Sequence, residues 1–187
     1  MSTRSQTEFI VVSKRGDDER IDTRTIYRHS DGYPSAMVPD LLTFIRWNRG
    51  RMDDVEYTAA NWIFWNKRRF EDVLLNPEWR SKDRKKIGWT NDCDETLKLG
   101  FGVCNNGEYH GDIEYLYRVI YAQGDADHHI TIEVYLVEGT SFRDPITESN
   151  FRLIGRLDVP ANLNHMSDLE IAALTLEFTR LSLPRGD

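Results

Sequence analysis

The sequence contains little cysteine and no long hydrophobic run. Two cysteines, Cys93 and Cys104, among 187 residues are too few for a disulfide framework or a four-cysteine metal site. We therefore expect two reduced thiols in a cytoplasmic protein. No apolar stretch approaches the roughly 18 residues that cross a bilayer, and the polar, charged N-terminus predicts no signal peptide.

The sequence also lacks the short motifs of the common enzyme classes. It contains no phosphate-binding P-loop, no dinucleotide-binding fingerprint, no GxSxG, no HExxH and no CxxC. These absences favour a non-enzymatic protein that needs no cofactor. A chain of 187 residues can nevertheless bury a sizeable core, and we expect residues 1–187 to form one domain.

Charge is unevenly distributed along the chain. The net charge is −7, but residues 46–89 hold 11 Lys/Arg against 7 Asp/Glu, a net charge of +4. The same segment contains all five tryptophans. We call residues 46–89 the basic Trp-rich segment and expect it to form a helical excursion from the domain.

The hydrophobic pattern predicts an α+β fold, with a mostly antiparallel sheet of about five strands and helices packed on one face. The expected order is two strands, two helices, a further group of strands and a final helix. Strands are expected at Thr7–Lys14, Arg20–His29, Ile113–Tyr121, Ile130–Val137 and Phe151–Val159, and Leu97–Asn105 could form another.

Local signals place the ends of the helices. Pro39 is expected to open the first helix, since the first turn needs no amide donor. Asp53 or Asp54 can cap a second helix that runs from about Glu56 to Leu75. Ser167 followed by Glu170 forms a capping box for the last helix. In the strand at 97–105, Gly100 and Gly102 indicate a bend or a close approach of the backbone.

The loop between the second strand and the first helix combines reactive and conformationally special residues. In a functional interpretation, Arg28 binds an anion, His29 and Asp31 transfer protons, and Tyr33 completes a ligand site. In a structural interpretation, Asp31 caps a turn, Tyr33 packs on the sheet and Arg28 pairs with an acid. The sequence leaves both interpretations open.

The same loop carries a resemblance to a family. The run Tyr27-Arg28-His29-Ser30-Asp31-Gly32-Tyr33-Pro34-Ser35, followed by Pro39-Asp40-Leu41-Leu42, resembles the YRHWDGYP…DL segment of small uncharacterised proteins from archaea, bacteria and their viruses. Ser30 stands where that family has Trp, and a weaker similarity lies around Glu114-Tyr115-Leu116-Tyr117. The resemblance implies a viral or mobile-element origin and supplies no catalytic roles.

Two further groups of residues suggest metal ligands, namely His110 with Asp112, and Asp125 and Asp127 with His128 and His129. The aspartates of the second group lie where a hairpin turn is expected. Adjacent histidines on a strand point to opposite faces, so His128 and His129 cannot easily bind one ion. We therefore predict no metal site.

The basic Trp-rich segment has two interpretations. Its cations could contact phosphates, and Trp65, Trp79 and Trp89 could stack on bases. However, a protein with a pI near 5.3 lacks the usual footprint of a nucleic-acid binder. A surface for an acidic protein partner explains the same residues better, since Trp and Arg are enriched at binding hot spots. The partner-binding residues are then Trp65, Arg68, Arg69, Trp79, Lys82, Arg84, Lys85 and Lys86.

The leading hypothesis is a small non-enzymatic binding or regulatory protein that acts through protein–protein contact. One alternative is a domain that binds or hydrolyses a nucleotide or a phosphorylated small molecule at the Arg28–Tyr33 loop. Another is nucleic-acid binding by the basic residues. A homodimer is also considered, because Tyr115, Tyr117 and Tyr121 alternate on one strand face that would be exposed if no helix covers it.

Overall fold

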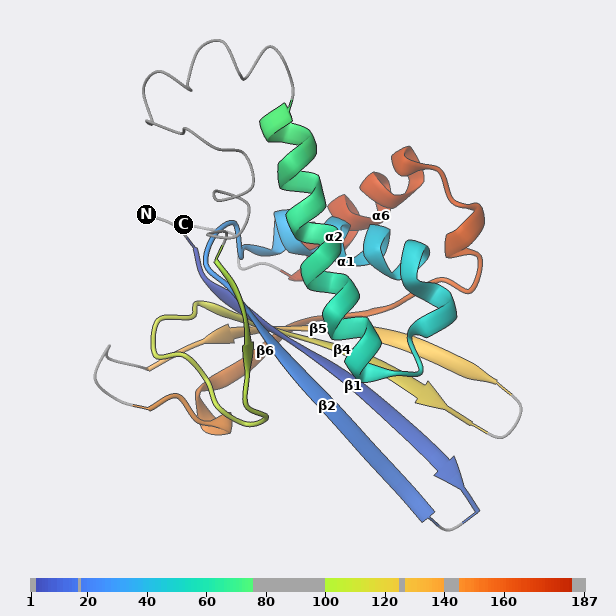
Figure 1. Ribbon diagram of the computed structural model, residues 1–187, viewed down its shortest axis with the longest axis horizontal. Helices are drawn as coiled ribbons and strands as arrows, with labels where there is room; N and C mark the ends of the chain where they lie inside the picture. The colour runs from blue at the N-terminus through green and yellow to red at the C-terminus, as the bar shows by residue number, and fades with distance from the viewer. Residues whose placement is uncertain (1–2, 17, 76–99, 125–126, 140–144, 183–187) are drawn as a thin grey trace.

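A mixed β-sheet with helices on one face forms the framework of the protein (Figure 1). The computed structural model describes residues 3–16, 18–75, 100–124, 127–139 and 145–182. The strands in this part of the chain are β1 (Ser5–Arg15), β2 (Asp18–Arg28), β3 (Phe101–Cys104), β4 (Tyr115–Gln123), β5 (His128–Val137) and β6 (Phe151–Asp158). The helices there are α1 (Pro34–Asn48), α2 (Val55–Leu75) and α6 (Asp168–Ser182), with short 3-10 turns η1 (Arg49–Arg51), η2 (Glu148–Asn150) and η3 (Leu163–His165).

The expected α+β class is confirmed, with differences in the sheet. Within the described residues the sheet has six strands in the order β3-β2-β1-β4-β5-β6. All neighbouring strands pair antiparallel except β1 and β4, which run parallel in the centre. The predicted hairpin is present, and the pairing of β1 with β2 extends from Ser5–Arg28 to Arg15–Asp18.

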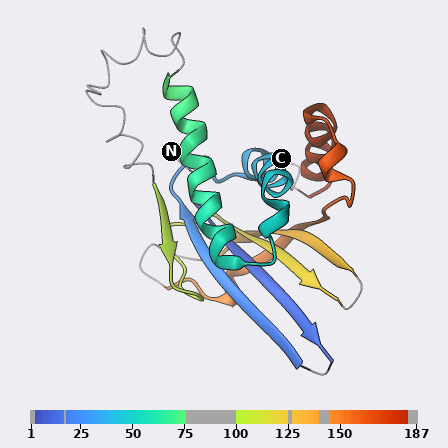
Figure 2. The ribbon, with the colours of Figure 1, turned by 45° about the vertical axis from the view of Figure 1, so that its right-hand side comes forward.

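The core lies between the sheet and the helices (Figure 2). Alternation along β1 directs Phe9 towards the helices, where its ring lies 5.9 Å from that of Phe44 and 6.1 Å from that of Trp62. Phe44 and Trp62 are themselves in edge contact at 5.0 Å. This cluster joins α1 and α2 to β1. Burying each ring stabilises the folded state by about 2–3 kcal/mol.

The first helix begins earlier than predicted. Pro34, and not Pro39, occupies its first turn, and Pro39 lies inside the helix. Burial explains why the helix tolerates this interior proline. Met37, Val38, Leu41 and further apolar residues of α1 are fully buried, and this burial offsets the lost backbone hydrogen bond.

The other two helices of the described chain begin where the sequence predicts. Asp54 Oδ1 accepts hydrogen bonds from the backbone N–H groups of Glu56 and Tyr57, at 3.0 and 3.1 Å, which confirms a cap at Asp54. The backbone N–H of Ser167 donates to Glu170 Oε2 at 2.7 Å, and that of Glu170 donates to Ser167 Oγ at 3.3 Å. The predicted capping box of α6 is therefore confirmed.

The tyrosine face that suggested a homodimer is covered. Tyr117 and Tyr121 lie on the helical side of β4 and are 0% and 9% exposed. The Tyr117 hydroxyl donates a hydrogen bond to the carbonyl of Gly32 at 2.7 Å. The condition for the dimer hypothesis, an exposed tyrosine face, is thus not met.

The other face of the sheet carries a charged network. Glu8, only 4% exposed, accepts hydrogen bonds from Arg118 Nε at 2.7 Å and from the Tyr109 hydroxyl at 3.1 Å. Arg118 also bonds both carboxylate oxygens of Glu148, at 2.7 and 2.8 Å. Burial, followed by the adjacent Glu148 and Glu8, raises the pKa of Tyr109 well above its ordinary value. The network fastens η2 and the chain around Tyr109 to the sheet.

Candidate functional site

The Arg28–Tyr33 loop contributes its arginine to the interior. Arg28 is 5% exposed and lies on the helical side of the sheet. Its Nη1 is 3.1 Å from Asp40 Oδ2 and 3.1 Å from the sulfur of Met37, and its Nε donates to the carbonyl of Ser30 at 2.7 Å. The guanidinium also lies 5.7 Å from the centre of the Phe101 ring. These contacts match the structural interpretation, in which Arg28 pairs with an acid.

His29 lies on the other side of the chain from Arg28. Its Nδ1 is 3.1 Å from the Tyr27 hydroxyl, and the Tyr27 ring stacks on that of His110 at 4.3 Å. Burial, and then the nearby charge of Asp112, raise the pKa of Tyr27. Asp112 Oδ2 in turn pairs with Arg4 at 3.2 Å. Tyr27 thus contacts both His29 and His110, with Asp112 nearby.

Asp31 and Tyr33 are placed at the surface. Asp31 has a positive φ of 54° and is exposed, so it forms the turn. Tyr33 is 42% exposed and immediately precedes α1, whereas the structural interpretation expected it to pack on the sheet. Gly32 approaches β1 closely, because an added Cβ would lie 2.8 Å from Ser5 Cβ. The four predicted ligand residues therefore do not converge on one point.

A different surface gathers large aromatic side chains. Trp47, Tyr57 and Phe64 are 54%, 55% and 54% exposed, respectively, on the outer side of α1 and α2. Tyr57 and Phe64 are seven residues apart, which places them on the same side of α2. Trp47 contacts Phe44 at 6.2 Å, and Phe44 contacts the half-buried Trp65 at 6.0 Å. We call this surface, formed by Trp47, Tyr57, Phe64 and Trp65 with Arg51 and Arg68, the aromatic face.

Two hydrogen bonds hold the helices beneath the aromatic face in a fixed arrangement. The side chain of Asn61 donates to Asn48 Oδ1 at 2.7 Å, and the buried Asn48 donates to Thr58 Oγ1 at 3.2 Å. Both bonds join α1 to α2, so the two helices that carry the exposed rings are fixed relative to each other. Arg51 lies over the ring of Tyr57 at 4.9 Å, which places a cation within the surface.

The predicted partner-binding residues fall only partly within the described chain. Trp65 and Arg68 belong to the aromatic face, with Arg68 exposed. The side chain of Arg69 and the whole of Trp79, Lys82, Arg84, Lys85 and Lys86 lie outside the described residues. The sequence analysis did not predict that Trp47, Tyr57 and Phe64 are exposed. A signal was available for α2, because its apolar residues cover a wider part of the helix surface than one buried face requires.

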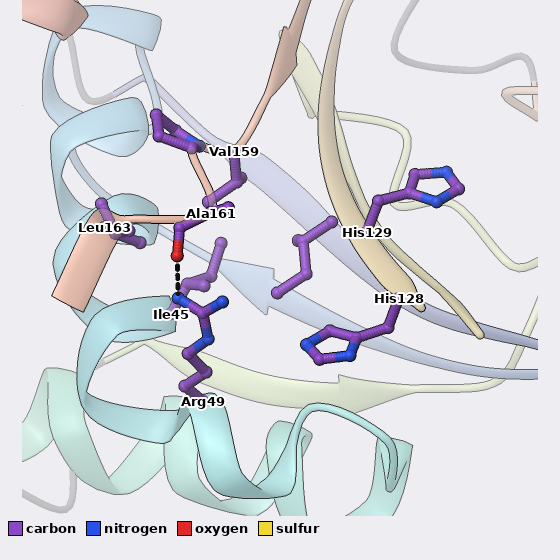
Figure 3. Close-up of a pocket in the computed structure, with 9 residues that line it drawn as sticks. Ile45, Arg49, His128, His129, Val159, Ala161 and Leu163 are labelled. Atoms are coloured by element: carbon purple, nitrogen blue, oxygen red, sulfur yellow. Dashed lines mark hydrogen bonds between the residues drawn. The ribbon is translucent and has the colours of Figure 1, made fainter. Parts of the chain in front are cut away.

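The residues that were considered as metal ligands are also dispersed. The rings of His128 and His129 point to opposite sides of β5 (Figure 3). Asp125 lies outside the described residues. Across the part of the chain that the structure describes, no group of three or more His, Cys, Asp or Glu side chains is placed to hold a metal ion.

Comparisons with known proteins assign no relative to this chain. No protein-family model matches it, and no curated protein or solved structure does so either. None of the helices in the described residues is long and apolar enough to cross a membrane.

Proposed function

We propose that the protein is a non-enzymatic binding protein that recognises an acidic protein partner through the aromatic face. The observation that carries the proposal is the exposure of Trp47, Tyr57 and Phe64, each by more than half, on one helical surface. Three large aromatic side chains exposed on two packed helices are typical of an interaction site. Trp, Tyr and Arg are also the residue types that dominate binding energy at protein interfaces.

Charge supports the acidic partner. Arg51 lies at the aromatic face with its guanidinium over the ring of Tyr57, and Arg68 is exposed there. The sequence that follows α2 adds further cations between Arg80 and Lys86. A cationic surface on a protein of net charge −7 steers an acidic partner to one place.

The alternative of an anion site at the Arg28–Tyr33 loop receives less support. Arg28 is buried and paired with Asp40, so binding an anion there requires that this pair be broken.

The experiment is a capture of proteins from host lysate by the tagged protein, with mass spectrometry of the bound fraction. Wild type is compared with a Trp47→Ser/Phe64→Ser variant and with an Ile21→Ser control. Ile21 is 59% exposed on β2, away from the helices, so the control removes a similar exposed apolar side chain. We expect acidic proteins that wild type and the control retain and that the double variant loses. Equal capture by all three proteins, or capture of nothing, would refute the proposal.

A further inference from the structure

A small pocket lies on the helical side of the sheet near the start of β5. Its volume is about 100 Å³. The lining comes from α1, η1, the start of β5 and the chain from the end of β6 into η3, namely Ile45, Arg49, His128, His129, Ile130, Val159, Pro160, Ala161 and Leu163. Most of these side chains are aliphatic, so the pocket favours an apolar group.

Arg49 is the fixed charge of this pocket. Its Nη1 donates to the carbonyl of Ala161 at 2.8 Å, which anchors the guanidinium at the edge of the pocket (Figure 3). Within the described residues Arg49 forms no ion pair with a carboxylate, whereas Arg46, three residues earlier on α1, pairs with Asp168 at 2.7 Å. A guanidinium can make several hydrogen bonds in one plane, and among the residues that the structure describes only the bond to Ala161 is formed.

His128 supplies a second polar group across the pocket. Its ring stacks on Tyr121 with a centroid separation of 5.4 Å and an interplanar angle of 24°. Figure 3 shows this ring directed towards Arg49, while the ring of His129 points away. Stacking holds the imidazole in place, so an anion between Arg49 and His128 would meet donors from both sides.

We propose that this pocket binds a small carboxylate with a short aliphatic chain. The carboxylate lies against Arg49 and His128, and the chain lies on Ile45, Val159 and Leu163. Size sets the length of the chain, since an apolar cavity of about 150 Å³ holds benzene. A pocket of about 100 Å³ therefore suits a chain of about four carbons. The site is separate from the aromatic face and does not depend on the function proposed for it.

The test is a titration of the full chain with 3-methylbutanoate, followed by NMR of the methyl groups. We expect saturable shifts at Ile45, Val159 and Leu163. The uncharged analogue 3-methylbutan-1-ol has the same carbon chain and is expected to bind at least ten times more weakly. Equal binding of the acid and the alcohol, or shifts that do not saturate, would overturn the proposal. This comparison uses the wild-type protein, so its result does not depend on the folding of a variant.

Matched variants then test the two polar groups. Arg49→Gln is expected to raise the dissociation constant at least tenfold, and His128→Ala about threefold or more. His129→Ala is the control, because His129 also lies at the pocket but its ring points away from Arg49, and it is expected to change affinity less than twofold. Unchanged affinity in Arg49→Gln, or equal losses in the two histidine variants, would contradict the assignment.

Discussion

Replacing Arg28 with methionine distinguishes a structural arginine from a ligand-binding one. Methionine keeps much of the aliphatic stem and removes the guanidinium. The change abolishes the contacts of Arg28 with Asp40, with the carbonyl of Ser30 and with Asn66. Because the Arg28 side chain is 6% exposed and that of Asp40 16%, the pair is screened little by water.

The expected loss follows from this burial. Breaking a buried ion pair on one side costs about 3–5 kcal/mol of unfolding free energy. Asp40 keeps some exposure to water, so we expect about 3 kcal/mol, which lowers the melting temperature by roughly 6–12 °C in a domain of this size. Arg24→Met is the matched control, because Arg24 lies on the same strand and pairs with Glu56 at the surface. That variant should lose less than about 1 kcal/mol.

The assay is urea and thermal unfolding of both variants beside wild type. If Arg28→Met were too unstable to purify, Arg28→Lys would serve, since lysine keeps the charge and loses the planar fork. An intermediate loss is expected for it. Equal stability of Arg28→Met and Arg24→Met would refute the structural role of Arg28. That result would favour the alternative in which the Arg28–Tyr33 loop binds an anion.

Two further predictions concern other parts of the structure. Burial alone would raise the pKa of Glu148, but hydrogen bonds from Tyr109 and Arg118 and the charge of Arg118 outweigh it and lower that pKa. Glu148 therefore stabilises the fold above its unfolded pKa of about 4.3, and this contribution is lost as the pH falls through the lower folded value. In urea unfolding between pH 6 and 3, Glu148→Gln should lose less stability than wild type, and parallel losses would contradict the network. Gly100→Ala should destabilise by about 1–3 kcal/mol because its Cβ would lie 2.3 Å from His29 Cβ. Gly102→Ala has open space and should change stability by no more than about 0.5 kcal/mol, and thermal unfolding that ranks the two equally would count against the close approach.

Local patterns predicted most of the framework. Alternating apolar residues located the strands of the described chain, and Asp54, Ser167 and Glu170 located helix starts, because these signals act over a few residues. The parallel pairing of β1 with β4 was not predicted. It joins Ser5 to Tyr115 across more than a hundred residues, and no local pattern encodes such a contact.

The site was predicted less well than the framework. Arg28 and His29 are adjacent in sequence, but successive side chains near a strand end point to opposite sides, so a shared site does not follow from adjacency. Gly100 was expected to approach other backbone closely and does so beside His29, whereas Gly102 has open space. The exposure of Phe64 depends on what covers α2, which the pattern of that helix alone cannot tell.

The most direct test of the proposed function is the affinity of a captured acidic partner for wild type, Phe64→Ala and Ile21→Ala, measured by calorimetry at two salt concentrations. Hot-spot aromatics contribute about 2 kcal/mol or more, so Phe64→Ala should weaken binding roughly thirtyfold. Ile21→Ala should bind as wild type does, and wild-type affinity should fall as salt rises. Equal affinities for the two variants, or binding that is insensitive to both Phe64 and salt, would contradict recognition through the aromatic face.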